Sequence, residues 1–168
     1  YLLSTDDGGE IFRIYGTEGS NVYLIYRNNE LLIIDPGFIE DIHHIKNEID
    51  FQFKNEVHIK GIFLTHYHKD HCGGAQRLSE ILNCEIYISD IDNEVFLHRE
   101  KYIALPREIN EGTRKFLENS SLFERCFSTD DSWYPVVNKT VKNDEEIMGF
   151  RTLIMPGHND GTCCLYNE

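Results

Sequence analysis

The sequence lacks the features that would place the chain in a membrane or bind it to polyanions. No apolar run reaches the roughly 18 residues that span a bilayer, and segment 1–7 has neither the basic region nor the apolar stretch of a signal peptide. Positive charge is scarce, with 16 Lys and Arg against 29 Asp and Glu, which gives a formal net charge of −13. Such a field repels phosphate backbones and anionic lipids. This favours a small-molecule substrate and counts against membrane or nucleic-acid partners.

The sequence also lacks paired cysteines. Its five cysteines are odd in number, and no two of them form a Cys-x-x-Cys motif. They are Cys72, Cys84, Cys126, Cys163 and Cys164. This pattern indicates reduced thiols in a cytoplasmic protein and not a disulfide framework. The first residue is Tyr1 and not Met, so we expect the chain to begin inside a longer gene product.

A length of 168 residues with 40% apolar content predicts one domain over residues 1–168. Apolar spacing predicts strands that alternate with helices, and therefore an α/β fold. The predicted strands are 10–16, 21–27, 30–35, 60–65 and 85–88, then 146–155 as a strand pair or one bent strand, and 162–166. The predicted helices are 40–51, 75–83, 92–101 and 111–120. Asn28-Asn29 predicts a two-residue hairpin turn. The stretch from about 90 to 143 is irregular.

Three histidines and an aspartate lie within six positions: His66, His68, Asp70 and His71. They directly follow the predicted buried strand 60–65, and the ends of strands are where open α/β sheets place ligand sites. Imidazole nitrogens and carboxylate oxygens suit zinc, and also iron or manganese. Four potential ligands behind a buried strand are too many for a solvated loop, so the sequence predicts a metal site.

These residues resemble the His-x-His-x-Asp-His signature of the metallo-β-lactamase superfamily, with Gly73-Gly74 following as in many members. Two further segments resemble its motifs in the same order. Residues 32–37 (Leu-Ile-Ile-Asp-Pro-Gly) are similar to the first motif, a buried strand that ends in Asp-x-Gly. Residues 156–162 (Pro-Gly-His-Asn-Asp-Gly-Thr) are similar to the third motif. The resemblance implies an αββα sandwich, with the irregular stretch 90–143 as an insert close to the active site.

The resemblance also implies roles for individual residues. His66, His68 and His158 would form a first metal site with an open position, while Asp70 and His71 would belong to a second one. Asp70 would also orient the nucleophile or assist proton transfer. Asp35 would steady the ligand loop without binding metal. We therefore expect one or two zinc ions, with iron or manganese as alternatives.

The chain departs from the family pattern after the third motif. A bridging Asp and a last His would both lie beyond Glu168, and the C-terminal half of the sandwich is apparently missing. The second metal site is then half built, and the missing strands should leave an apolar face. Two explanations stay open: the remaining residues lie on a longer chain, or a partner, such as a second copy, completes the fold.

The function implied by the resemblance is that of a glyoxalase II-like hydrolase. A zinc-bound hydroxide would attack an ester, thioester or lactone. Three alternatives stay open: an iron-dependent persulfide dioxygenase of the same fold, a phosphodiesterase or nuclease, and a non-catalytic scaffold. The charge of −13 counts against a nuclease.

A few residues near the motifs have ordinary structural interpretations. We interpret Cys72 as a small packing residue and Asp160 as a turn former. We expect Tyr67 to pack or to line the cleft, pointing away from the metal. Trp133 and Tyr134 fit either a lid over the cleft or plain packing.

Overall fold

The computed structural model describes residues 3–5, 8–54, 56–98 and 132–167, and these form two sheets and a layer of helices. In the main sheet the strands follow sequence order. They are β1 (Leu3–Ser4), β2 (Glu10–Ile14), β3 (Val22–Arg27), β4 (Glu30–Ile34), β5 (His58–Phe63), β6 (Glu85–Ser89) and β7 (Lys139–Val141). Strands β1 to β4 pair antiparallel, and β4 to β7 pair parallel. The second sheet is antiparallel and contains β8 (Glu146–Ile147), β9 (Phe150–Ile154) and β10 (Cys163–Tyr166).

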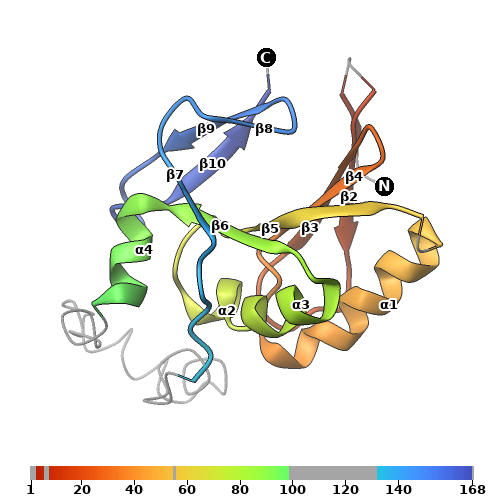
Figure 1. Ribbon diagram of the computed structural model, residues 1–168, viewed down its shortest axis with the longest axis horizontal. Helices are drawn as coiled ribbons and strands as arrows, with labels where there is room; N and C mark the ends of the chain where they lie inside the picture. Colours follow the sequence, from red (N-terminus) through yellow and green to blue (C-terminus); the bar gives the residue numbers. More distant parts are fainter. Residues whose placement is uncertain (1–2, 6–7, 55, 99–131, 168) are drawn as a thin grey trace, which may run out of the picture.

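The main sheet lies between the helices and the second sheet (Figure 1). The helical elements are η1 (Ile39–Asp41), α1 (Ile42–Phe53), α2 (Lys69–Cys72), α3 (Ala75–Leu82) and α4 (Asp90–Leu97). Helices α1, α2 and α3 cover one face, and α4 lies beside the end of β6. Each parallel strand is reached by a helical crossover, as parallel pairing requires. The fold is therefore α/β, as the alternating pattern predicts.

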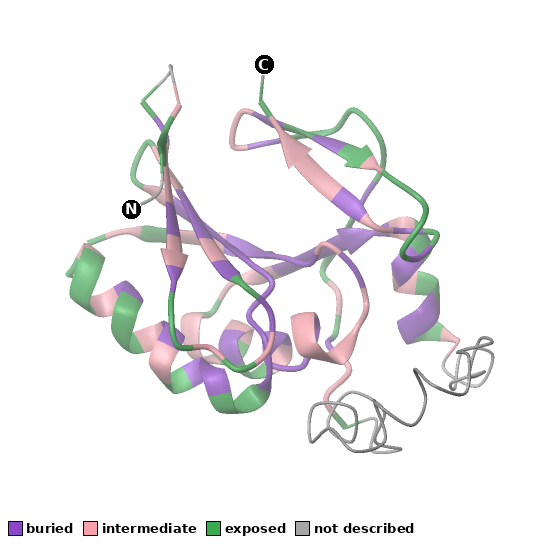
Figure 2. Cartoon of the chain, turned by 180° about the vertical axis from the view of Figure 1, so that it is seen from behind, coloured by how far each residue is buried: buried purple, intermediate pink, exposed green. Residues whose placement is uncertain are grey.

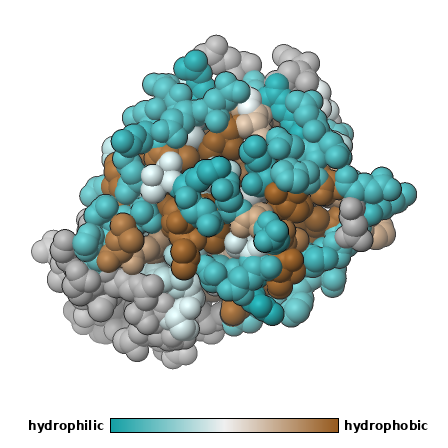
Figure 3. Space-filling view, in the orientation of Figure 1, coloured by the Kyte–Doolittle hydropathy of each residue, from teal (hydrophilic) through white to brown (hydrophobic). Residues whose placement is uncertain are grey.

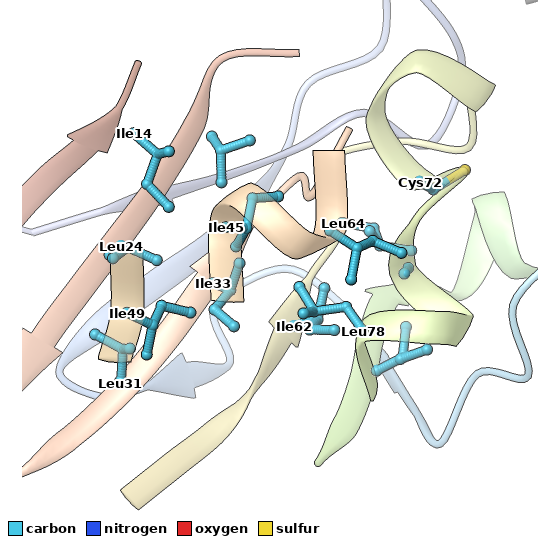
Figure 4. Packing of buried hydrophobic residues seen from close by; sticks show 14 of the residues in the cluster. Ile14, Leu24, Leu31, Ile33, Ile45, Ile49, Ile62, Leu64, Cys72 and Leu78 are labelled. Atoms are coloured by element: carbon cyan, nitrogen blue, oxygen red, sulfur yellow. The ribbon is translucent and has the colours of Figure 1, made fainter. Parts of the chain in front are cut away.

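Two apolar cores lie on opposite faces of the main sheet, because successive strand residues point to opposite sides. Leu31 and Ile33 of β4 belong to the helix-side core, which Figure 4 shows with Ile45 and Ile49 of α1 and Leu78 of α3. The alternate β4 residues Leu32 and Ile34 face the second sheet. They form the second core with partners that include Phe63, Tyr87, Phe150 and Cys163. Figure 2 shows this buried centre running through the strands. Since β4 is buried on both faces, it has the continuous apolar sequence of an interior strand.

Helix α1 forms where the sequence places apolar residues on one helical face. Ile42, Ile45 and Ile49 are all buried at this spacing. The helix ends at Lys54, which adopts a left-handed conformation and donates its N–H to the carbonyl of Asp50. Asn83 ends α3 in the same way. The helix predicted over 40–51 therefore begins as the 3-10 turn η1 and continues to Phe53.

Most predicted elements are present with shifted ends. Asn28 and Asn29 both have positive φ, and Arg27 pairs with Glu30, which confirms the two-residue hairpin. Segment 146–155 is a strand pair. The helix predicted over 92–101 begins earlier, at Asp90, and ends at Leu97. The helix predicted over 111–120 lies outside the described residues. Strands β1 and β7 and the short helix α2 were not predicted.

The outer side of the second sheet carries exposed apolar side chains. Leu153 is 40% exposed and Met155 is 51% exposed. Figure 3 shows apolar residues across the middle of one face of the molecule, with hydrophilic residues around them. In the parts that the structure describes, no helix is long and apolar enough to cross a membrane.

Candidate metal centre

The candidate site lies where the parallel strands β4, β5 and β6 end. Asp35 follows β4, the segment from Thr65 to His71 follows β5, and helix α4 follows β6. The carboxyl ends of parallel strands meet at one edge of a sheet, so the topology brings these segments together. The loop that carries His158 joins β9 to β10 and is anchored to the same edge, because the Cys163 N–H donates to the Thr65 carbonyl at 2.8 Å.

Three of the predicted ligands converge at this edge. The candidate ligand nitrogens of His66, His68 and His158 all lie within 4.8 Å of one another. His68 Nδ1 is 3.1 Å from His66 Nε2 and 2.9 Å from His158 Nε2. His66 is buried, His68 is half-buried and His158 is exposed. The centre is therefore anchored at one side and accessible at the other.

This arrangement fits a metal ion better than it fits hydrogen bonding alone. A ring nitrogen offers either one N–H or one lone pair. His68 Nδ1 therefore cannot make good hydrogen bonds to both of its histidine neighbours. Three lone pairs aimed at one point can share a cation, and tetrahedral zinc with nitrogen ligands spaces them by about 3.4 Å. The donor set consists of three imidazoles, which suit zinc, iron and other transition metals.

Burial keeps the rings of His66 and His68 neutral. Burial, together with the nearby His71, His68 and His158, lowers the pKa of His66 from 6.5 to about 2. Burial and His158 lower the pKa of His68 to about 4, against a small opposing effect of Asp70. Neutral imidazole is the form that binds metal. At pH 7 neither ring would have to lose a proton before binding.

Asp35 connects the first motif to the second. Its Oδ1 accepts the Thr65 N–H at 2.8 Å, and its Oδ2 accepts the Thr65 hydroxyl at 2.6 Å and lies 2.9 Å from His71 Nδ1. The side chain is almost fully buried, and the residue has a φ of 50°, a strained conformation that Asp tolerates better than most residues. Thr65 Oγ1 also lies 3.0 Å from His66 Nδ1, so Asp35 orients two histidines through this network.

Asp70 and His71 form a second group of donors. His71 Nε2 lies 3.7 Å from Asp70 Oδ2, while its Nδ1 is held by Asp35. Burial lowers the pKa of His71, but the hydrogen bond and charge of Asp35 and the charge of Asp70 outweigh it, so the net shift is upward. The structure thus brings all five predicted donors to one region, with His71 in ring contact with His66 at 4.1 Å between centroids.

A second buried carboxylate, Asp41, fixes the chain beneath the site. It accepts the N–H groups of Glu18, Gly19 and Phe38 at 2.8 to 3.1 Å. A Cβ on Gly19 would lie 2.6 Å from the Asp70 carbonyl oxygen, so only glycine allows this close approach. Sequence reasoning missed Asp41, which comes four residues after Pro36-Gly37, although that pair was a usable signal for a turn.

Sequence reasoning also missed Asp92, which is 1% exposed at the start of α4. Its Oδ2 accepts the Tyr67 N–H at 3.1 Å and the Asn159 side-chain amide at 2.9 Å. Burial raises the pKa of Asp92 to about 6, against the lowering effect of hydrogen bonds from Asn159, Tyr67 and Gly161. The sequence signal was only an Asp three residues after Ser89, which resembles ordinary helix capping.

The remaining predicted residues take structural positions. Cys72 is fully buried, and its thiol lies 3.1 Å from the Tyr67 carbonyl oxygen, so it packs beneath the ligand loop. Tyr67 is half-buried against the helix-side core, with its ring 4.7 Å from that of His68. Trp133 and Tyr134 pack against the same core, as the packing alternative predicted. Asp160 is exposed in the loop after His158.

Residues 15–168 match the family described as the metallo-beta-lactamase superfamily. The match covers well over half of the chain, so the chain belongs to this superfamily. This confirms the resemblance drawn from the three motifs.

Two curated relatives differ in what their names say they act on. Hydroxyacylglutathione hydrolase from Methylobacillus flagellatus is 26% identical over 89 residues, which is 53% of this chain and 33% of that protein. Ribonuclease J 2 from Staphylococcus aureus is 27% identical over 125 residues, which is 71% of this chain and 22% of that protein. This chain therefore matches only a third or less of the length of these two relatives.

Solved structures show the same fold. A metallo-beta-lactamase from Cronobacter sakazakii superposes with a TM-score of 0.64 at 20% identity, covering 91% of this chain and 52% of that one. A structure of TTHA1623 in a di-iron-bound form superposes with a TM-score of 0.61 at 22% identity, covering 93% and 66%. At these identities the likeness shows the fold alone. It confirms the metallo-β-lactamase type of α/β architecture, of which the chain spans about half.

Proposed function

We propose that the protein is a metal-dependent hydrolase that cleaves a small ester, thioester or lactone, with zinc held by His66, His68 and His158. The convergence of three imidazole nitrogens within 4.8 Å carries this proposal. Membership of the superfamily and the likeness to a hydroxyacylglutathione hydrolase support it. When bound, the metal supplies a Lewis acid that polarises a carbonyl group and lowers the pKa of water toward 7.

Binding the metal, transferring the proton and holding the ligand loop would each fall to different residues of the chain. His66 and His68 offer neutral nitrogens because their pKa values are lowered. Asp70 is partly exposed next to them and would accept the proton of the attacking water, then return it to the leaving group as the carbon–sulfur or carbon–oxygen bond breaks. Asp35 holds the ligand loop in place without binding the ion. Asp70 and His71 would supply part of a second site.

We further propose a single domain over residues 1–168 in a cytoplasmic protein, with the stretch 90–143 close to the site. Within it, the start of α4 already lies against the ligand loops through Asp92. This contact supports a role for the stretch in shaping the pocket.

The main competitor is a phosphodiesterase, because the match to Ribonuclease J 2 covers 71% of this chain. The net charge of −13 argues against a nucleic-acid substrate, since an overall field of this sign repels phosphate backbones. A thioester of glutathione or a lactone carries far less charge than a nucleic acid.

The proposal is tested by metal analysis followed by turnover. We expect about one or two zinc ions per chain after reconstitution, and cleavage of a 2-hydroxyacyl glutathione thioester or a lactone that His66→Ala abolishes. His43→Ala is the matched control, because His43 is exposed on α1 away from the site. Cleavage of bis-p-nitrophenyl phosphate alone would favour the phosphodiesterase, and bound iron with oxygen uptake would favour the dioxygenase. Metal binding without any turnover would favour a scaffold.

A further inference from the structure

Asp92 is a buried residue that bridges the two loops that carry the candidate ligands. Its Oδ2 accepts one N–H from Tyr67, which lies between His66 and His68, and one from the side chain of Asn159, which follows His158. These donors lie 25 and 67 residues away in sequence. One oxygen atom thus joins the segment with two candidate ligands to the loop with the third.

The second loop is built around this carboxylate. Asn159 is 5% exposed, its Oδ1 accepts the Thr162 hydroxyl, and its carbonyl oxygen accepts the Gly157 N–H at 3.0 Å. A Cβ on Gly161 would lie only 2.1 Å from Asp92 Oδ1, so the backbone of the loop rests directly on the carboxylate. By contrast, His158 itself is exposed. The buried Asn159 therefore holds the backbone next to His158, whose ring contacts His68.

Asp92 is in turn fixed by the main sheet. It lies in the first turn of α4, which directly follows β6, and its own N–H donates to Ser89 Oγ at 3.1 Å. Within the described residues, the Asp92 carboxylate accepts hydrogen bonds from N–H groups and forms no ion pair with a lysine or arginine. A buried carboxylate that receives several N–H donors is held in one geometry, because leaving any donor unpaired would be costly.

We propose that Asp92 is a positioning residue that sets the spacing between the His66–His68 segment and His158, and thereby the geometry of the three-histidine centre. The inference rests on the proposed metal site but not on any particular substrate. Without Asp92, the Tyr67 N–H and the Asn159 amide lose their shared acceptor. The His158 loop would then no longer be aligned with His68.

The test compares metal binding by three variants. Asp92→Ala removes the shared acceptor. Asp90→Ala removes the same charge from the same turn of α4, where Asp90 lies 3.9 Å from Lys142. Ile49→Ala destabilises the helix-side core far from the loops. Zinc affinity is measured by competition with a chromogenic chelator, and coordination is read from the absorption spectrum of the cobalt(II) derivative.

We expect Asp92→Ala to weaken zinc binding by about 10- to 100-fold, as is typical of residues that orient metal ligands. The cobalt(II) spectrum should lose the intensity of four-coordinate geometry. Asp90→Ala and Ile49→Ala should keep wild-type affinity and spectrum. Asp92→Asn keeps one acceptor oxygen and should bind zinc more tightly than Asp92→Ala. Asn159→Ala leaves Asp92 in place but removes one of its donors, and should by itself reproduce the change in the cobalt(II) spectrum. These two variants keep the test decisive if Asp92→Ala does not fold.

Equal affinities for Asp92→Ala and Asp90→Ala, or a loss in Asp92→Ala no larger than in Ile49→Ala, would overturn the inference. Wild-type protein that binds no zinc or cobalt would overturn both this inference and the proposed function. Wild-type protein that binds metal but hydrolyses nothing would overturn the proposed function alone, because the readout for Asp92 is coordination and not turnover.

Discussion

The stability of the metal-free protein should fall between pH 7.5 and pH 5 because two histidines are held neutral. In the unfolded chain these imidazoles titrate near 6.5, whereas in the folded chain the pKa is about 2 for His66 and about 4 for His68. At pH 5 the unfolded state therefore binds two protons that the folded state does not. A lowered histidine pKa leaves stability intact above 6.5 and reduces it as the pH falls below that value.

The loss of unfolding free energy is about 1.36 kcal/mol for each pH unit below the pKa of the unfolded histidine. Each histidine loses about 2 kcal/mol at pH 5, or about 4 kcal/mol for the pair. Asp92 has the opposite effect on the free energy of unfolding, because its pKa of about 6 lies above the unfolded value of 3.8. Its protonation stabilises the folded state by about 1 kcal/mol at pH 5. The raised pKa of His71 means that this residue also stabilises the folded protein as the pH falls. Since solvent reaches the half-buried His68, we expect a net loss of about 2 kcal/mol.

Urea unfolding at the two pH values, followed by the fluorescence of the single tryptophan Trp133, measures this loss. A chelator keeps the protein free of metal. The double variant His66→Gln/His68→Gln has no titrating ring at either position, so its stability should stay level or rise slightly toward pH 5. If the double variant lost as much stability as the wild type, the two histidines would not be its source and the reasoning would be refuted.

Three shorter predictions concern the support of the site. Asp35→Ala should cost about 3 kcal/mol of unfolding free energy in urea, because Thr65 and His71 lose a buried acceptor; a cost below about 0.5 kcal/mol would contradict this network. Leu78→Ala should cost about 2–5 kcal/mol at a fully buried site of α3, measured in the same way; an unchanged midpoint would mean that the core collapses to fill the space. The Cys72 thiol should resist iodoacetamide at pH 8 in the native protein and react in urea, because burial and nearby carboxylates raise its pKa well above 9.0; rapid native labelling would disprove its burial.

The sequence predicted which histidines come together better than it predicted what supports them. His66, His68 and His158 belong to short motifs whose residue types are chemically specific, so their convergence could be expected before any fold was known. Asp92 could not be found in this way, because its role depends on contacts across 25 and 67 residues and a local pattern assigns it to a helix terminus.

The missed elements have similar explanations. In β7, Lys139 and Thr140 are exposed and only Val141 is buried, so the strand has no apolar run. It exists because it pairs with β6 and not because of local propensity. Helix α2 has only four residues, two of which are candidate metal ligands, so its sequence reads as a loop. Strand β4 and the second half of β5, by contrast, are buried at the centre of the sheet, and their apolar runs were clear.

The distance in sequence between the candidate ligands has a consequence for how the centre is assembled in the cell. His68 and His158 are 90 residues apart, and ribosomes add about 5–20 residues each second. The first two histidines therefore leave the ribosome about 5 to 20 seconds before the third. During this interval the nascent chain offers a two-histidine site. Metal binding by all three candidate ligands would then wait until β9 and β10 have paired and carried His158 to the edge of the main sheet.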